Sequence, residues 1–315
     1  MYKVSFLIPA YNASAYIAKC LDHILTSTLP KEEYQIIVWN DGSTDDTLKI
    51  ATEYSEAYNN ITVVSKENMG VAEVRRNMFK LAQGEYIWEC DSDDFIVTEN
   101  IPRIVNYAYN KKLDILSFDY IQEDVFGNQK PMSVRFKHSI YVSFLWNKLY
   151  KNSFLRNNNV DFKGDLYTGD DVIFNCQAYA NTTKTAHLNV LGYCYMYNPL
   201  SLTRDKNKSL EDVKSMIHCL DYFIEYWHTA KNKRIWTEHI NKDIIMVKKM
   251  SEQYDDSIRT ELCADIESKL EAFIKHPRLG MTKIIIKYPK VANIVNTYLD
   301  NISFILSRLY SKLYY

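Results

Sequence analysis

The fold is decided by residues 85–94, which read EYIWECDSDD. The apolar run 86–90 predicts a short buried strand that ends in a group of acidic residues. Side chains two residues apart leave a strand in the same direction, so Asp91 and Asp93 are expected to point the same way. Glu89 is unusual inside such a run. Its charge predicts either that the strand lies at the edge of a sheet or that Glu89 belongs to a site.

Four more apolar runs predict strands, at residues 4–8, 35–39, 61–65 and 114–118. Between the first four strands the apolar residues recur at helical spacing. The predicted helices contain residues 16–25, 48–55 and 71–81. The first is expected to begin after a cap at Asn12 or Ser14, and the second after a capping box of Ser43 and Asp46. Alternation of strands and helices favours an α/β fold with a mostly parallel sheet.

Polar loops follow three of these strands directly: Pro9–Asn12, Asn40–Ser43 and Asp91–Asp94. Ligands of open α/β sheets bind beyond the carboxyl ends of the strands. We therefore expect the three loops to open onto one edge of one sheet and to form a ligand site there.

Asp91 and Asp93 form an Asp-x-Asp motif. Clustered carboxylates repel each other unless a cation lies among them. Mg²⁺ and Mn²⁺ suit such hard oxygen ligands, and they bind one or two carboxylates together with substrate phosphates. The motif predicts a divalent cation that neutralises a nucleotide diphosphate. The alternative is that residues 91–94 cap a helix and bind water.

Two other loops contain candidate nucleotide ligands. Asp41 at a strand end could accept the N3–H of a uracil ring, and Tyr11 offers a flat face to the base. The alternative for Tyr11 is packing, since the chain has 25 tyrosines. The loop 68–71 precedes a helix that contains Arg75 and Arg76, and helix N-termini and guanidinium groups favour phosphate. The alternative for the arginines is a solvated basic face.

Asp170 and Asp171 precede an apolar run about 80 residues after the Asp-x-Asp motif. Their position predicts the start of a helix. One of the two carboxylates could act as general base toward an acceptor hydroxyl, a role worth about 10²–10⁴ in rate. The alternative is that the pair only caps the helix.

Taken in order, these motifs resemble those of the family 2 glycosyltransferases. The resemblance is dense over residues 1–100 and thinner through 146–150 and 169–171. The segments that carry it are Val4–Asn12, Asn40–Asp45, Asn68–Val71, Gly84–Ile87 and Asp91–Asp94. It implies a GT-A fold, a single α/β domain whose first half binds the nucleotide.

The resemblance also implies roles for individual residues. Pro9, Tyr11 and Asp41 match positions that line the base pocket, and Arg75 matches an arginine near the diphosphate. Asp91 and Asp93 match the metal-binding motif, with Asp93 as the direct ligand of Mn²⁺ or Mg²⁺, and Asp171 matches the base of an inverting transfer. The expected site residues are Pro9, Tyr11, Asn12, Asp41, Asn68, Gly70, Arg75 and Asp91 for the nucleotide-sugar, Asp91 and Asp93 for the metal, and Asp170 and Asp171 for catalysis.

The sequence departs from the family pattern at two places. Arg76 stands where the family has asparagine after its arginine. Asp170-Asp171 replaces the usual Glu-Asp, which leaves open which of the two carboxylates is the base.

Beyond residue 205 the apolar spacing is helical throughout. We expect a glycosyltransferase domain over 1–205 and a helical extension of three or four helices over 206–315. The apolar stripes lie at Leu210, Val213, Ile217, Leu220, Ile224 and Trp227, at Ile240, Ile244, Val247 and Met250, and at Ile258, Leu262, Ile266, Leu270 and Phe273.

Residues 281–315 contain five basic residues and one acidic residue. Two interpretations are open: a basic amphipathic helix on an anionic membrane, or a stripe that packs on the main domain or on a second subunit. The net charge of −1 gives no general attraction to nucleic acid. Six cysteines without paired spacing, and no leader or membrane-spanning run, predict a cytoplasmic protein with reduced thiols, with the inner face of the plasma membrane as a place of peripheral contact.

The expected activity is inverting transfer of a sugar from a nucleoside diphosphate donor, with UDP expected, to a hydroxyl of a saccharide or lipid-linked saccharide in surface polysaccharide or glycan synthesis. Two alternatives stay open. A sugar nucleotidyltransferase would release pyrophosphate, and a non-catalytic nucleotide-sugar binding module would bind UDP and Mn²⁺ without turnover.

Overall fold

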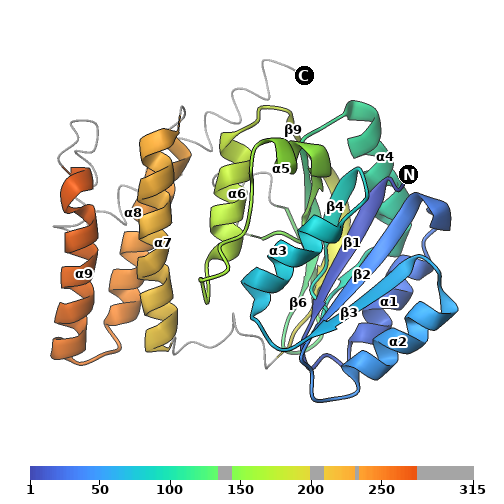
Figure 1. Cartoon of the computed structure of the whole chain (residues 1–315), viewed down its shortest axis with the longest axis horizontal. Helices are drawn as coiled ribbons and strands as arrows, with labels where there is room; N and C mark the ends of the chain where they lie inside the picture. The colour runs from blue at the N-terminus through green and yellow to red at the C-terminus, as the bar shows by residue number, and fades with distance from the viewer. Residues whose placement is uncertain (134–143, 199–208, 231–233, 275–315) are drawn as a thin grey trace. The chain divides into compact units, whose positions relative to one another are not determined.

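The computed structural model describes residues 1–133, 144–198, 209–230 and 234–274 (Figure 1). Its internal contacts divide the chain into two compact units. The first contains residues 1–137, 142–165 and 177–201, and the second contains 138–141, 166–176 and 202–315. The predicted boundary at residue 205 stays a prediction.

The N-terminal part of the first unit is a parallel βα repeat. Its strands lie in the order β3-β2-β1-β4, and the chain returns from β3 at one edge to β4 through α3. The elements are β1 (Val4–Ala10), α1 (Ile17–Leu25), β2 (Tyr34–Asp41), α2 (Thr47–Ala57), β3 (Ile61–Lys66), α3 (Val71–Leu81) and β4 (Tyr86–Glu89).

The second half of the sheet is mixed. β8 pairs antiparallel with β4, β6 pairs antiparallel with β8, and β9 runs parallel to β6. The short strands β5 and β7 pair antiparallel with β9 and β6. The elements are β5 (Phe95–Ile96), α4 (Ile101–Lys111), β6 (Ile115–Glu123), β7 (Gln129–Met132), β8 (Lys148–Lys151), α5 (Asn152–Asn157) and β9 (Thr185–Tyr195), with 3-10 turns at Lys31–Glu33 and Thr98–Asn100.

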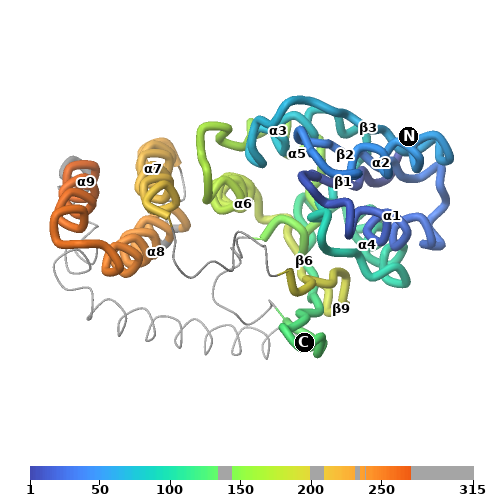
Figure 2. Tube along the Cα trace, turned by 90° about the horizontal axis from the view of Figure 1, so that it is seen from below, coloured from blue at the N-terminus to red at the C-terminus, as the bar shows by residue number. Residues whose placement is uncertain are grey.

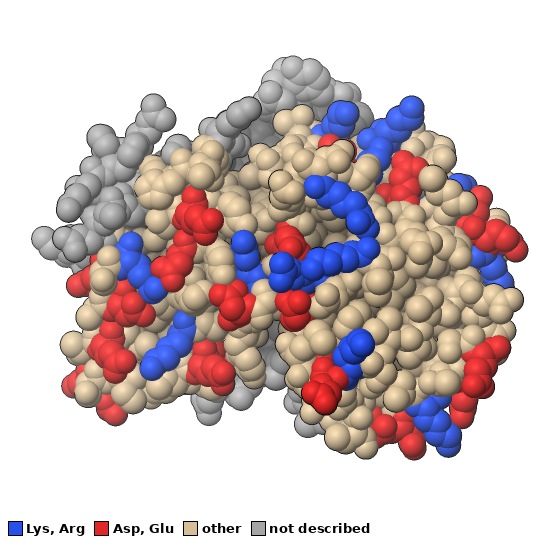
Figure 3. Space-filling view, in the orientation of Figure 1, with Lys and Arg blue, Asp and Glu red and all other residues tan. Residues whose placement is uncertain are grey.

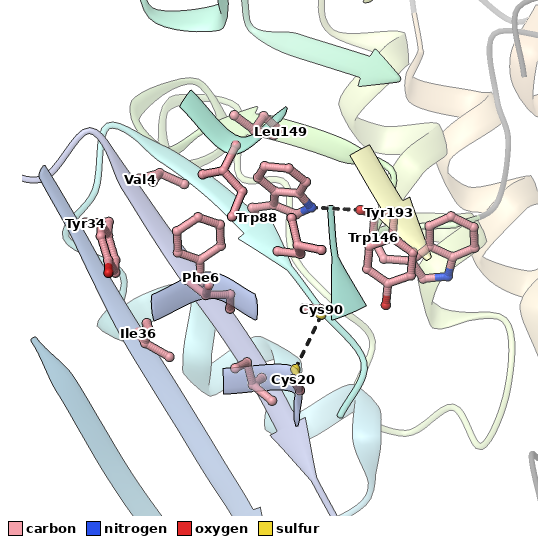
Figure 4. Packing of buried hydrophobic residues seen from close by; sticks show 14 of the residues in the cluster. Val4, Phe6, Cys20, Tyr34, Ile36, Trp88, Cys90, Trp146, Leu149 and Tyr193 are labelled. Carbon is pink, nitrogen blue, oxygen red and sulfur yellow. Dashed lines mark hydrogen bonds between the residues drawn. The ribbon is translucent and has the colours of Figure 1, made fainter. Parts of the chain in front are cut away.

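Helices cover both faces of this sheet, with α1, α2 and α4 on one face and α3 on the other (Figures 1 and 2). The core on the first face is built around Trp88, whose indole N–H donates to the carbonyl of Trp146 at 2.9 Å (Figure 4). Phe6 and Phe118 pack against the same indole. The mixed α/β fold class expected from the sequence is confirmed.

Two predicted helix caps are wrong. Helix α1 begins after Tyr16 and has no side-chain cap, because Asn12 and Ser14 bond instead to the loop that follows β2. The proposed capping box of Ser43 and Asp46 does not form either, because Ser43 accepts the backbone N–H of Asn12 and α2 has no side-chain cap. Both polar clusters join the two loops rather than capping a helix.

The second unit contains the start of α6 (Asp170–Ala180) and three further helices. These are α7 (Leu210–Thr229), α8 (Arg234–Ser251) and α9 (Asp256–Ile274). A capping box of Ser209 and Asp212 begins α7. The predicted apolar stripes supply many of the buried residues of the three helices, among them Ile217, Ile244 and Ile266.

Residues 281–315 lie outside the described part of the chain, so the structure does not bear on the predicted basic helix. Among the described residues, none of the helices has the length and apolar character needed to cross a bilayer. The six cysteines are free thiols, and all but Cys263 are buried.

Candidate functional site

The loops after β1 and β2 are joined by hydrogen bonds. Asn12, which has a positive φ of 49°, donates its backbone N–H to Ser43 at 3.0 Å and accepts from the backbone N–H of Thr44 at 2.9 Å. The backbone N–H of Ser14 donates to Asp45 at 3.0 Å. Desolvation would raise the pKa of Asp45, but the hydrogen bonds from Thr47 and Ser14 outweigh it and hold that pKa well below its ordinary value. Asn12, Ser43 and Asp45, which the sequence places in two separate motifs, thus take part in the hydrogen bonds that join the two loops.

The loop before α3 is attached to the same place through Asp41. This buried carboxylate accepts the backbone N–H of Met69 at 2.9 Å and that of Gly70 at 3.2 Å. Asn68 donates its side-chain amide to the carbonyl of Asp41 at 3.1 Å. Sequence reasoning gave Asp41 a role toward a base, and it missed this role in holding the neighbouring loop.

Gly42 makes this close approach possible. Its φ is +73°, and a Cβ at this position would lie 2.8 Å from the backbone nitrogen of Asn68. A larger residue would therefore push the 68–70 loop away from the strand end. The Asn-Asp-Gly sequence at the end of β2 therefore has a structural reason, which is the close approach of the 68–70 loop.

Tyr11 is 54% exposed. It is therefore not a core residue, and its role toward a base stays a prediction. Met69 and Val71 are also partly exposed apolar side chains. Pro9 lies in β1 opposite Trp39 and is partly buried. The residues expected at a base pocket are thus gathered by hydrogen-bonded loops that leave an aromatic ring open to solvent.

The Asp-x-Asp motif is held by side chains from other elements. Asp91 lies 3.4 Å from the guanidinium of Arg75, which lies on α3. Asp93 accepts the side-chain amide of Asn198 at 2.7 Å. Arg76, the departure from the family pattern, instead pairs with Asp161 at 3.0 Å. The structure therefore brings Arg75 and Asp91 together, as the expected site requires.

The next acidic residue, Asp94, has a structural role. Its carboxylate is buried and accepts the hydroxyl of Tyr193 at 2.9 Å and the backbone N–H of Met196 at 2.7 Å. Burial and the charges of Asp91 and Asp93 raise the pKa of Asp94 well above its ordinary value, against the effect of these hydrogen bonds. Asp94 thereby joins the motif to the end of β9.

A divalent cation fits Asp91 and Asp93 by the chemistry of the donors. Both carboxylates are partly exposed, and each is touched by a donor that restrains it. Two carboxylates are the number that Mg²⁺ uses alongside phosphate oxygens and water. Among the described residues no group of three or more His, Cys, Asp or Glu side chains gathers as a metal site.

Asp170 and Asp171 begin α6, as the sequence predicts, directly after Gly169 with its φ of +90°. Asp170 is 3% exposed, whereas Asp171 is partly exposed. Asp171 accepts the backbone N–H of Val172 at 2.7 Å. A base must reach its proton from solvent or substrate, so exposure favours Asp171 of the two. Both residues belong to the second compact unit.

Sequence reasoning missed Tyr193 and Asn198 altogether. Both lie about a hundred residues beyond the motif that they hold, and a tyrosine or an asparagine carries no pattern that links it to a distant carboxylate. Glu89 had a signal, its charge within an apolar strand. On the face shown in Figure 3, acidic and basic side chains are interspersed, so the face has no large area of one sign.

A family profile described as "Glycosyl transferase family 2" matches residues 5–180. Among curated relatives, a poly(ribitol-phosphate) beta-glucosyltransferase of Bacillus spizizenii is 30% identical over 203 residues, which cover 62% of this chain and 32% of the relative. The uncharacterized glycosyltransferase EpsJ of Bacillus subtilis is 30% identical over 226 residues, which cover 66% of this chain and 65% of EpsJ. The chain thus spans between about a third and two thirds of these relatives.

Solved structures with the same fold include that of Staphylococcus aureus TarS in complex with UDP. Its TM-score is 0.71 at 20% identity, and the match covers 97% of this chain and 92% of that chain. The mannosyltransferase PcManGT of Pyrobaculum calidifontis, in complex with GDP-Man and Mn²⁺, has a TM-score of 0.55 at 14% identity and covers 98% and 88%. These likenesses show the GT-A fold.

The matched residues include every loop of the first unit that carries the site, from Asn12 through the Asp-x-Asp motif, and they extend through the start of α6. With more than half of its length matched by the family profile, the chain belongs to glycosyl transferase family 2.

Proposed function

We propose that the protein is an inverting glycosyltransferase that moves a sugar from a nucleoside diphosphate donor to a hydroxyl of a saccharide or lipid-linked saccharide. The observation that carries this proposal is the attachment of the loops after β1, after β2 and before α3 to one another through Asn12 and Asp41, beside an exposed Tyr11, together with the contact between Asp91 and Arg75 of α3. Family membership supports the same activity.

The donor that we propose is a UDP-sugar. The Asp41 carboxylate uses two of its roughly four acceptor positions on Met69 and Gly70, which leaves positions for the N3–H of a uracil ring. Tyr11 would stack on the base. The TarS structures contain UDP or UDP-GlcNAc and the PcManGT structure contains GDP-Man, so the fold is compatible with more than one base.

The diphosphate would lie beside Arg75 and the Asp-x-Asp motif, which are already in contact through Asp91. Asp93, with Asp91, would hold Mn²⁺ or Mg²⁺, and a bound cation stabilises the charge that develops on the departing diphosphate. The N-terminus of α3 at Gly70 would contribute backbone N–H groups and the helix dipole to the phosphates. Asp171 would take the proton of the acceptor hydroxyl as it attacks the anomeric carbon from the opposite side.

The acceptor that we propose is a cell-surface polysaccharide or its lipid-linked precursor. Support comes from relatives whose names specify poly(ribitol-phosphate) as the acceptor. Those relatives are much longer than this chain, so their acceptors remain a guide to a class of substrate rather than to one compound.

Asp93→Ala tests the proposal. Hydrolysis and transfer from a panel of nucleotide-sugars are measured with and without Mn²⁺, and we expect turnover of the native chain to require the cation and Asp93→Ala to abolish it. The matched control is Asp265→Ala, which removes an exposed carboxylate from the middle of α9 and is expected to leave turnover unchanged. Normal turnover by Asp93→Ala would refute the assignment of the site.

The same assay separates the two alternative activities. A sugar nucleotidyltransferase would form pyrophosphate instead of a nucleoside diphosphate. A non-catalytic binding module would show a thermal shift with UDP and Mn²⁺ but release no product with any donor.

Peripheral contact with the plasma membrane is proposed from residues 281–315 of the sequence alone. Co-sedimentation with anionic liposomes compares the full chain with one ending at residue 280. Loss of binding on truncation would support membrane contact through these residues, and equal sedimentation of both chains would remove that hypothesis and favour packing on the protein or on a second copy.

A further inference from the structure

Glu89 lies in the middle of the sheet, not at its edge. Strand β4 is flanked by β1 on one side and β8 on the other, so the edge interpretation of this charge is wrong. The side chain is 1% exposed. Its neighbour Trp88 points into the core on the α1 and α4 face, so Glu89 points to the opposite face, which α3 covers. A buried carboxylate at such a place requires compensation.

Arg75 supplies that compensation from α3. Its Nε lies 2.5 Å from the Oε1 atom of Glu89, and its Nη2 lies 3.4 Å from the Oδ1 atom of Asp91. The Arg75 side chain is only 13% exposed. One cation thus bridges a buried carboxylate within the strand and the first carboxylate of the Asp-x-Asp motif, and the shorter of the two contacts is to Glu89.

This division of one positive charge affects the charge that the motif offers to a cation. Without Glu89, more of the positive charge of Arg75 would act on Asp91 and would offset the negative charge of that carboxylate. Interactions between charges this close in a partly buried place are strong, because the effective dielectric constant there is lower than that of water. A second carboxylate beside the same guanidinium leaves more of the negative charge of Asp91 uncompensated, and it restrains Arg75 in one position.

We propose that Glu89 is a positioning residue that compensates the charge of Arg75 and thereby raises the affinity of Asp91 and Asp93 for a divalent cation. The inference rests on the proposed function, because it assigns the cation to the Asp-x-Asp motif. The affinity of this site for the cation would then depend on a buried residue that touches neither the metal nor the diphosphate.

The test measures Mn²⁺ affinity instead of turnover. Free Mn²⁺ is followed by electron paramagnetic resonance while the metal is titrated into the full chain at saturating UDP. Glu89→Gln keeps the size of the side chain and an acceptor for Arg75 but removes the charge. We expect it to weaken Mn²⁺ binding about tenfold, at the lower end of the effect of losing an outer-shell partner.

The matched control is Glu85→Gln. Glu85 precedes the same strand and also forms an ion pair, with Lys151 at 3.6 Å. It lies four residues from Glu89, roughly 13 Å along an extended chain. Removal of the same charge at this distance is expected to change the Mn²⁺ dissociation constant by less than about twofold, since salt screens separated charges.

A double variant separates charge compensation from a structural effect. Arg75 is also the residue proposed at the diphosphate, so the double variant is compared with the native chain and with Glu89→Gln in the absence of UDP. In Glu89→Gln with Arg75→Gln both charges are gone, so no guanidinium offsets the charge of Asp91, and the Mn²⁺ affinity without UDP is expected to return to within about threefold of the native value. A structural role for Glu89 would make the double variant no better than Glu89→Gln. The double variant also removes the guanidinium that loses its Glu89 partner, so it can be compared directly with the native chain if Glu89→Gln alone fails to fold.

Two results would overturn the inference: Glu89→Gln binding Mn²⁺ as tightly as the native chain, or a folded double variant that binds it no more tightly than the single variant. Failure of the proposed function looks different, because the native chain itself would then bind neither UDP nor Mn²⁺ in the same titration.

Discussion

The hydroxyl of Tyr193 lies between the backbone of Asp91 and the carboxylate of Asp94. It accepts the N–H of Asp91 at 3.0 Å and donates to Asp94 at 2.9 Å. Tyr193 is fully buried in β9 and stacks on Trp146, and burial raises its pKa well above the ordinary value, so the hydroxyl keeps its proton. The turn that carries the candidate metal ligands is therefore held by a strand from the other half of the sheet.

Tyr193→Phe tests this relationship. The change leaves a buried N–H and a buried carboxylate without their shared partner, which we expect to lower the free energy of unfolding by about 1–3 kcal/mol. Urea unfolding followed by circular dichroism measures the effect. Tyr120→Phe is the control, because Tyr120 lies in the same aromatic cluster against Trp146 and its hydroxyl makes no hydrogen bond among the described residues. Equal stability of the two variants would contradict a role for the Tyr193 hydroxyl.

Gly42→Ala is expected to damage the loop that begins α3. The new Cβ would lie 2.8 Å from the backbone nitrogen of Asn68, so the loop must move. Gly127→Ala is a matched control, since Gly127 also has a positive φ, +77°, but an added Cβ there meets nothing within 4 Å. Strain at positive φ alone costs about 1–2 kcal/mol, and we expect Gly127→Ala to show that loss only.

The comparison uses urea unfolding together with the thermal shift produced by UDP and Mn²⁺. Gly42→Ala should lose more stability than Gly127→Ala and should also lose much of its UDP-dependent shift. If both variants keep the native UDP response, the approach of Asn68 to Gly42 has no bearing on nucleotide binding.

Asp45 makes stability depend on pH in a defined direction. Hydrogen bonds from Thr47 and Ser14 lower its folded-state pKa below the unfolded value of about 3.9. A group of this kind contributes stability that is fully present above the unfolded pKa and is lost as pH falls through the folded pKa. The contribution of Asp45 should therefore be constant near neutral pH and decline below about pH 4.

Urea unfolding of the native chain and of Asp45→Asn at pH 7, 4 and 3 checks this. The native chain should be the more stable at pH 7, and the difference should narrow at pH 3. Subtracting the free energy of unfolding of Asp45→Asn from that of the native chain at each pH removes the effect of the other carboxylates. A difference that widens as the solution becomes more acidic would mean that the sign of the pKa shift is wrong.

Asp170 and Asp171 should respond differently to the loss of charge. Asp171→Asn is expected to lower the turnover number by about 10²–10⁴, the usual worth of a general base, with unchanged UDP affinity. Asp170→Asn changes a buried side chain, so its main effect should be on the free energy of unfolding. Donor hydrolysis, UDP titration and urea unfolding are measured on both. The reverse pattern would move the base to Asp170.

Much of the fold could be predicted from local pattern. Apolar runs and helical spacing depend on neighbours in the chain, so β1 to β4, α3 and the helices α7 to α9 lie where the sequence placed them. The position of the three polar loops after strands also follows, because the carboxyl ends of parallel strands meet at one edge of a sheet. The fold class and the candidate carboxylates could be identified from the sequence without the tertiary structure.

Other features required the tertiary structure, because they depend on contacts between residues far apart in the chain. The sequence suggested that Asn12 and Ser43 cap helices, whereas in the fold they bond to each other. It identified Glu89 as unusual but could not identify Arg75 as its partner, and nothing local connects Tyr193 with Asp94. The sequence determined which chemical groups the site contains, and only the packing of distant strands and helices decided which atoms hold those groups in place.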